Sequence, residues 1–188
     1  MELKPWKKLS EEVIATNPWW EYRKWIFELP SGKLADFHLP YRGDFVMVVP
    51  VRNDGKLLMV NGYRPFVDSM SLEFPAGGVE SGEDYEVSAQ RELNEEGQVR
   101  AEKLDLIGEG FSNGGGTNAR YKAYLGTELS HQSTQHDETE EFELHWYSVT
   151  EIDEKIHSGD ILDCHTISVW YQAQPALKKY LDQISKSR

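Results

Sequence analysis

One predicted helix, over residues 83–96, constrains this chain more than any other feature. Glu92 and Glu96 are four residues apart and therefore share one face of that helix, with Glu95 beside them. Carboxylates at this spacing repel one another, and they lie in the last turn, where the helix dipole disfavours anions. A divalent cation would reverse both penalties, and Mg²⁺ suits the site because it binds carboxylate oxygens and substrate phosphates. The competing interpretation is a solvated acidic helix end in an acidic chain.

Predicted strands and helices alternate around this central helix. Ser81 and Asp84 are expected to form a capping box at its start, and Gly97 is expected to end it in the left-handed conformation. Strands are predicted over residues 25–29, 34–39, 45–51, 57–62, 104–111, 121–126 and 142–149. Further helices are predicted over residues 152–157, 166–173 and, after Pro175, 176–184. This order indicates an α/β or α+β sheet packed by helices.

Charge and cysteine content limit the classes of partner. The 188 residues include 32 acidic and 20 basic side chains, which gives a net charge of -12 and argues against a nucleic-acid partner. An acidic protein that handles phosphates needs local basic residues or bound cations. Cys164 is the single cysteine, so no intramolecular disulfide can form, as is typical of a reducing compartment. No apolar run has signal-peptide or membrane-spanning length, and we expect a soluble cytoplasmic protein without a membrane partner.

The spacing around the helix carries a family resemblance. Five residues separate Gly77 from Glu83, seven more precede Arg91-Glu92, and then come Leu93, Asn94, Glu95-Glu96 and Val99. This pattern resembles the Nudix box, the signature of the Nudix hydrolase superfamily. It departs from the family at one position, because Gln98 stands where the family has Gly. Gly97 comes one residue earlier, which we interpret as a shifted helix cap.

The resemblance extends to one branch of that superfamily. Residues 72–78 resemble the segment before the box in ADP-ribose pyrophosphatase-like members, and residues 137–142 resemble their acidic loop. It implies a Nudix-type α/β/α sandwich with a mixed sheet, formed by residues 43–188. It also implies that residues 1–42 form an N-terminal β-rich arm that pairs two copies into a homodimer. The expected function is metal-dependent cleavage of the diphosphate linkage of a nucleotide sugar such as ADP-ribose.

The resemblance also assigns roles to individual residues. Glu92 and Glu96 would bind Mg²⁺ or Mn²⁺, with Glu95 as a third candidate, and Arg91 and Glu83 would orient these ligands. The remaining assignments are the Ala76 carbonyl and Glu140 as metal ligands, Glu138 as the catalytic base, and Arg64 as a phosphate contact. For Glu138, the competing interpretation is an ordinary solvated acid of an acidic loop.

The substrate is less constrained than the reaction. ADP-ribose pyrophosphatases carry a Pro and then a Glu in the loop that corresponds to residues 111–119. Here the Pro is absent and Ala119 stands where the Glu would fall. ADP-ribose is therefore one candidate, and GDP-mannose or another nucleoside diphosphate derivative is an alternative. A non-catalytic nucleotide-sugar sensor also stays open, whereas the net charge disfavours an RNA-directed hydrolase.

Two further groups of residues have competing interpretations. Trp20 and Tyr22, in the aromatic N-terminal segment, could stack on a nucleobase, although packing is the more common fate of such side chains. The adjacent Cys164 and His165 suggest a catalytic nucleophile and its base. The sequence identifies no further residue that would complete such a site, so a structural role is favoured.

Overall fold

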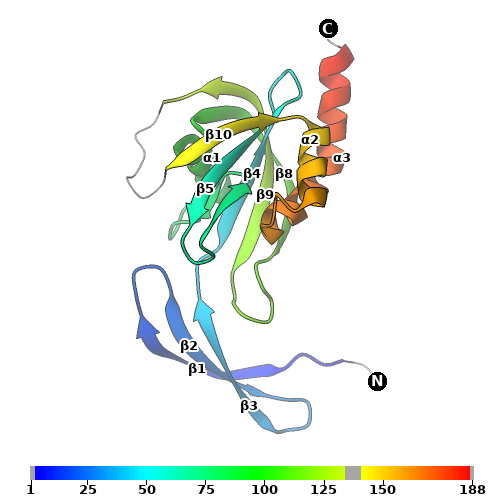
Figure 1. The fold of residues 1–188 in the computed structure, drawn as a ribbon. Helices are drawn as coiled ribbons and strands as arrows, with labels where there is room; N and C mark the ends of the chain where they lie inside the picture. The colour runs from blue at the N-terminus through cyan, green and yellow to red at the C-terminus, as the bar shows by residue number, and fades with distance from the viewer. Residues whose placement is uncertain (1–2, 134–140, 187–188) are drawn as a thin grey trace. The chain divides into compact units, whose positions relative to one another are not determined.

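The computed structural model of the protein describes residues 3–133 and 141–186. Its elements follow one another along the chain as shown in Figure 1: β1 (Lys7–Thr16), β2 (Glu21–Glu28), β3 (Leu34–Tyr41), β4 (Phe45–Pro50), β5 (Leu57–Arg64), β6 (Ser69–Glu73), β7 (Ala76–Gly78), α1 (Tyr85–Gly97), β8 (Val99–Phe111), β9 (Arg120–His131), β10 (Phe142–Tyr147), α2 (Val149–Ser158) and α3 (Cys164–Lys186). The chain divides into two compact units. The first comprises Met1–Asp44 with Phe111–Arg120, and the second comprises Phe45–Gly110 with Tyr121–Arg188.

The first unit is a three-stranded antiparallel sheet with the strand order β1-β2-β3. The sequence predicted shorter versions of β2 and β3 and missed β1, whose residues are all exposed. The glycine-containing loop between β8 and β9 belongs to this unit. The Asn118 side chain exchanges hydrogen bonds of 2.8 and 2.7 Å with the backbone of Arg42, and the Thr117 hydroxyl donates to the Pro40 carbonyl at 2.9 Å.

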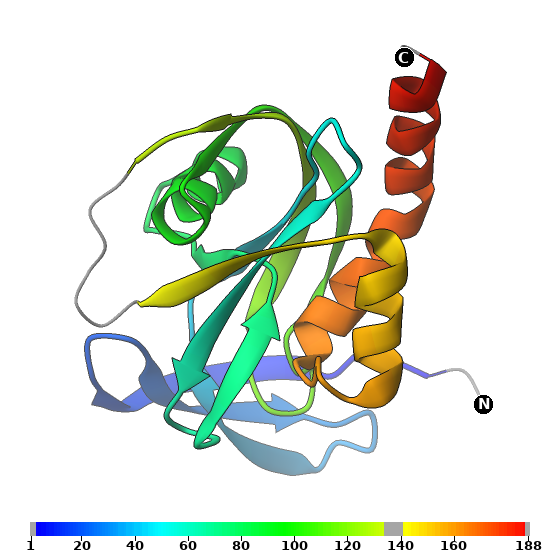
Figure 2. The same ribbon diagram turned by 45° about the horizontal axis from the view of Figure 1, so that its top comes forward.

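The second unit confirms the predicted α/β fold with a mixed sheet. Strands β7-β4-β9-β8 form a four-stranded sheet in which β4 is parallel to β9 and antiparallel to β7. Strands β10-β5-β6 form an antiparallel sheet. Helix α1 covers one side of the strands, and α2 and α3 cover the other side, as Figures 1 and 2 show. The layers of this unit therefore have the expected α/β/α order.

Alternation along β4 explains why helices lie on both sides. Successive side chains of a strand point to opposite faces. Met47 and Val49 enter a core that contains Trp170 of α3, whereas Val46 and Val48 enter a second core. That second core contains residues of α1, namely Ala89 and Leu93. A strand that is apolar on both faces needs a covering layer on each, and this unit supplies both.

Both predicted caps of the central helix were wrong. Asp84, rather than Ser81, is the N-cap, and its side chain accepts a hydrogen bond from the Glu86 N–H. At the other end, Gly97 is still helical, and Gln98 adopts the left-handed conformation with a φ of 53°. A Cβ on residue 97 would lie 2.9 Å from Leu58 Cδ2. Glycine at residue 97 is therefore explained by close packing against Leu58. The helix C-cap is residue 98, so the expected shift of the cap to residue 97 does not occur.

The break predicted at Pro175 was also wrong, because α3 is continuous through this proline. Proline lacks the N–H that would bond to the carbonyl of Tyr171. Trp170, Ala173 and Leu177 are nevertheless buried on one face, so core packing on both sides of Pro175 outweighs the lost bond. Across the described part of the chain, no helix, α3 included, is both long and apolar enough to span a membrane.

Candidate active site

Helix α1 places two carboxylates inside the second unit. Leu93 and Ala89 are fully buried in the core beneath the helix, which fixes its rotation. Glu92 and Glu96 are consequently buried as well, with exposed fractions of only 8% and 6%. Glu95 points more towards solvent, since 41% of its side chain is exposed. Buried carboxylates are rare unless they are paired or bind a cation, so this arrangement requires positive charge nearby.

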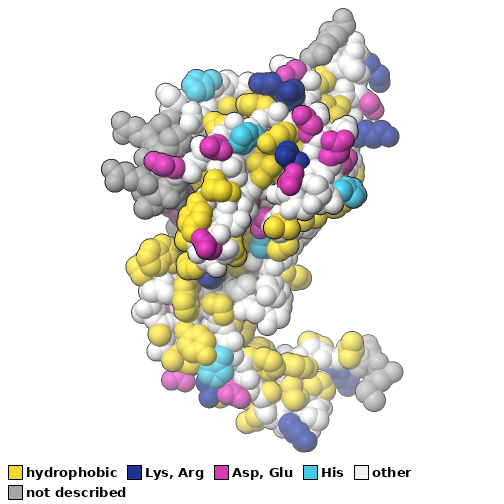
Figure 3. Space-filling view, in the orientation of Figure 1, with side chains coloured by type: hydrophobic (Ala, Val, Ile, Leu, Met, Phe, Trp, Pro, Cys, Tyr) yellow, Lys and Arg dark blue, Asp and Glu magenta, His cyan; other side chains and the backbone are white. Residues whose placement is uncertain are grey.

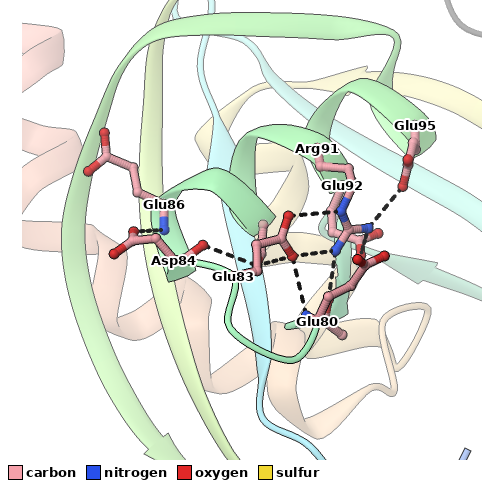
Figure 4. A network of polar contacts seen from close by, with 9 residues as sticks. Glu80, Glu83, Asp84, Glu86, Arg91, Glu92 and Glu95 are labelled. Carbon is pink, nitrogen blue, oxygen red and sulfur yellow. Dashed lines mark hydrogen bonds and ion pairs between the residues drawn. The ribbon is translucent and has the colours of Figure 1, made fainter.

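Arg91 supplies part of that charge and links the acidic side chains together (Figure 4). Its Nη1 donates to Glu92 Oε1 at 2.6 Å and to Glu95 Oε2 at 3.1 Å. Its Nη2 donates to Glu83 Oε2 at 3.1 Å and to the Gly78 carbonyl at 2.8 Å. A guanidinium suits this position because its planar fork can hold several acceptors in a fixed geometry.

Glu83 of the cluster is held by both Arg91 and Ser88. The Arg91 guanidinium and the Ser88 hydroxyl, which donates at 2.6 Å, lower the pKa of the Glu83 carboxyl from 4.5 to about 2. In return, the hydrogen bonds to Glu83 and the charge of Glu92 raise the pKa of Arg91 above its ordinary value. Glu83 and Arg91 therefore hold each other ionised, and Arg91 also donates to the Glu92 carboxylate.

The backbone of residues 76–78 approaches the buried carboxylates closely. The Ala76 N–H donates to Glu96 Oε2 at 2.8 Å. A Cβ on Gly77 would lie 2.1 Å from Glu92 Cδ and 2.2 Å from both of its carboxylate oxygens. The Glu92 carboxylate thus occupies the space of a side chain at residue 77, and any residue larger than glycine there would displace it. Strand β7 is held in this place by its pairing with β4, in which Ala76 lies opposite Met47.

This donor set fits a divalent cation. Glu83, Glu92 and Glu95 share the single guanidinium of Arg91, and Glu96 lies one helical turn from Glu92. Negative charge thus exceeds positive charge in a site that is largely buried. The donors of this cluster are carboxylate oxygens, which are among the ligands that Mg²⁺ and Mn²⁺ prefer.

Arg64 lies at the edge of this cluster, held by a partner that the sequence did not reveal. Its Nε and Nη2 donate to the two carboxylate oxygens of Glu73 at 3.0 and 2.7 Å. The hydrogen bonds to Glu73 raise the pKa of Arg64, and the charges of Glu96 and Asp163 raise it further. The sequence analysis also did not predict the role of Ser88, whose hydroxyl donates to Glu83. Glu73 lies within the 72–78 segment that resembles the family, which was the available signal for its importance.

The other predicted site residues belong to the first unit or fall outside the described residues. Trp20 and Tyr22 belong to the first unit, where the Trp20 N–H donates to Asn17 Oδ1 at 3.0 Å and the Tyr22 ring lies 5.6 Å from that of His38. A cavity of about 250 Å³ in the same unit is lined by other residues, namely Trp6, Trp25, Phe27, Phe37, His38, Leu39 and Gly114–Thr117. Glu138 and Glu140 fall outside the described residues, so their roles stay predictions.

Comparison with known proteins identifies a family and several related chains. The family model described as NUDIX domain matches residues 41–170. The ADP-ribose pyrophosphatase of Bacillus subtilis is 30% identical over 141 residues, which cover 74% of this chain and 76% of that protein. The methanol dehydrogenase activator of Bacillus methanolicus is 32% identical over 155 residues, with coverage of 80% and 84%. The crystal structure of an ADP compounds hydrolase superposes on this chain with a TM-score of 0.83 at 20% identity, covering 95% of this chain and 97% of that one.

Proposed function

This chain belongs to the NUDIX domain family and is a Nudix hydrolase, and from that premise we propose that it cleaves the diphosphate linkage of a nucleotide sugar. The products would be a nucleoside monophosphate and a sugar phosphate. The observation that carries the proposal is the pair of buried carboxylates, Glu92 and Glu96, held by Arg91 and by the backbone of Ala76 and Gly77. ADP-ribose pyrophosphatases among its relatives support the choice of substrate class.

The proposed cofactor is Mg²⁺, with Mn²⁺ as a substitute. Glu92, Glu96 and the carbonyl of Ala76 would hold it, with Glu95 and Glu140 as additional ligands. When bound, such a cation masks the charge of the diphosphate oxygens and activates a water molecule. Glu83 contributes by fixing Arg91, which in turn orients the carboxylate of Glu92.

Proton transfer and phosphate binding fall to other side chains in this proposal. Glu138 would act as the general base, which requires it to come within hydrogen-bond reach of the attacking water. Arg64 would contact a phosphate, and Glu73 presents its guanidinium in a fixed orientation. A fixed cation of this kind costs little reorganisation when charge develops on a phosphate oxygen.

The identity of the sugar nucleotide is the least constrained part of the proposal. ADP-ribose is the first candidate, and GDP-mannose or another nucleoside diphosphate derivative is the alternative. Trp20 and Tyr22 are candidate contacts for the base. Ala119, where related pyrophosphatases have Glu, allows a different preference among sugars.

We also propose that residues 1–42 form an arm that pairs two copies of the chain. Many large apolar side chains of this segment are exposed, as the yellow surface over β1–β3 in Figure 3 illustrates: Trp6, Leu9, Val13, Ile14, Trp19, Leu34 and Phe37. Extended apolar surface of this kind marks an interface more often than a free face. Light scattering coupled to size exclusion should give twice the chain mass of 21.6 kDa, and the mass of a single chain would contradict the proposal.

A substrate panel tests the reaction. Purified protein with Mg²⁺ is incubated with ADP-ribose, ADP-glucose, GDP-mannose and diadenosine polyphosphates, and the products are identified by mass spectrometry. Release of a nucleoside monophosphate together with a sugar phosphate supports the proposal. If every compound stays intact with both Mg²⁺ and Mn²⁺ while calorimetry detects tight binding, the protein is a nucleotide-sugar sensor instead.

A further inference from the structure

We propose a second ion site, for a borderline-soft divalent cation such as Zn²⁺, at the start of α3. Its ligands would be the carboxylate of Asp163, the thiolate of Cys164 and the imidazole of His165. The sequence alone suggested no third partner for Cys164 and His165, and the structure supplies Asp163. This inference rests on the geometry of these three side chains and is independent of the proposed reaction.

The three donor atoms already have a spacing close to that of a metal site. One ligand atom from each residue lies within 4.8 Å of the other two. Cys164 Sγ is 3.9 Å from His165 Nδ1, and Asp163 Oδ1 is 3.8 Å from the same nitrogen. Tetrahedral Zn²⁺ with ordinary bond lengths to S, N and O separates its ligands by about 3.3–3.6 Å. The two distances to His165 exceed these values by a few tenths of an ångström, and the separation of Asp163 and Cys164, which is at most 4.8 Å, would shorten by up to about 1 Å when an ion binds.

Two of the three ligands are already held in place. Asp163 uses its other carboxylate oxygen, Oδ2, to accept a hydrogen bond from the Thr166 N–H at 2.6 Å, which leaves Oδ1 directed at His165. The imidazole of His165 lies edge-to-face against Phe45 and Tyr121, with ring centroids 5.2 and 5.9 Å away. Such prior ordering lowers the entropic cost of binding an ion.

The chemistry of this set differs from that of the α1 carboxylates. Sulfur and nitrogen donors select Zn²⁺ or Co²⁺, whereas the all-oxygen set of α1 suits Mg²⁺. Three protein ligands leave a fourth position for water. Cys164 is exposed, and a quarter of the side-chain surface of both Asp163 and His165 is accessible, so an ion can reach the site. Binding converts the thiol to a thiolate and releases its proton to solvent.

Titration with Co²⁺ tests the proposal, because a cobalt–thiolate bond gives a near-ultraviolet charge-transfer band that oxygen ligands do not give. The full chain, first stripped of metal, should develop this band with an end point of one Co²⁺ per chain. Zn²⁺ should bleach the band by displacement, and Mg²⁺ should leave it unchanged. Absence of the band overturns the proposal, and so does an end point of one Co²⁺ per two chains, which would place the ion between the thiols of two copies.

Variants assign the ligands. Cys164→Ser should abolish the band, and His165→Gln should weaken Co²⁺ binding by at least about tenfold, the smallest loss usual for disturbing a metal site. Glu96→Gln is the matched control, since it removes a charge from the α1 carboxylates, leaves all three proposed ligands in place and should retain the band. Alkylation of Cys164 in the wild-type chain is a second route to the same loss that needs no variant to fold. Unchanged Co²⁺ affinity in His165→Gln would overturn the three-ligand site.

Because Glu96→Gln is expected to lose turnover yet keep the cobalt band, failure of the two proposals can be told apart. A chain that hydrolyses nucleotide sugars but shows no band refutes the α3 site alone. A chain that shows the band but hydrolyses nothing refutes the proposed reaction alone.

Discussion

Gly77→Ala should damage the candidate active site without unfolding the protein. The new Cβ would lie 2.1 Å from Glu92 Cδ, and protein Cβ contacts essentially never fall below 3.0 Å. The Glu92 carboxylate therefore has to move by about 0.9 Å, away from the position in which it accepts the 2.6 Å hydrogen bond from Arg91. A misplacement of about 1 Å in a catalytic group costs about 100-fold in rate. That loss corresponds to about 2.7 kcal/mol of transition-state stabilisation.

Gly78→Ala is the matched control for this experiment. A Cβ on Gly78 would meet no atom within 4 Å, although residue 78 adjoins residue 77 in β7. The assay compares the kcat/KM of the two variants with saturating Mg²⁺ and follows their melting temperatures in parallel. We expect the Gly77 variant to lose about 100-fold while the Gly78 variant stays near wild type. Equal activity of the two variants would refute the claim that the Glu92 carboxylate must occupy this space.

Two further predictions concern the helix cap and the pH dependence of stability. Gln98→Gly should be more stable than Gln98→Ala by about 0.5–1 kcal/mol in urea unfolding, because the left-handed φ of 53° strains any residue with a Cβ; a more stable Ala variant would reject that conformation. For Glu83, the lowered pKa means that ionisation stabilises the fold above pH 4.5, and that this contribution is lost as the pH falls towards about 2. The difference in melting temperature between wild type and Glu83→Gln should therefore be largest near neutral pH and shrink below pH 4.5, and a difference that does not change with pH would contradict the assigned pairing with Arg91.

Local patterns predicted the elements that carry the site. The apolar runs that became β4 and β5 were identified because both faces of these strands are buried, and the central helix was placed within two residues of its true start. The carboxylates of Glu92 and Glu96 were identified because helical spacing alone puts them on one face. Charge repulsion at a helix end is a local property, and it can be seen without a structure.

Features decided by tertiary contacts were not predictable in this way. Gly97 was predicted to end the helix because glycine usually has that role. Its actual role depends on Leu58, which is distant in the sequence and leaves no room for a Cβ at residue 97. Pro175 was predicted to separate two helices, but the buried side chains of Trp170 and Leu177, one on each side of it, keep α3 continuous. The pair between Arg64 and Glu73 depends on how β5 lies against β6, and no local pattern specifies it.

We propose that the buried carboxylates on α1 hold a catalytic divalent cation, and one comparison of variants tests this directly. Turnover of ADP-ribose, or of the best substrate in the panel, is measured against Mg²⁺ concentration for wild type, Glu96→Gln and Glu86→Gln. Glu86 is on the same helix but exposed, so its variant changes the same charge away from the cluster. We expect Glu96→Gln to lose at least about 100-fold in kcat and to require more Mg²⁺, and Glu86→Gln to match wild type. Near-normal turnover and Mg²⁺ dependence in Glu96→Gln would contradict the proposal.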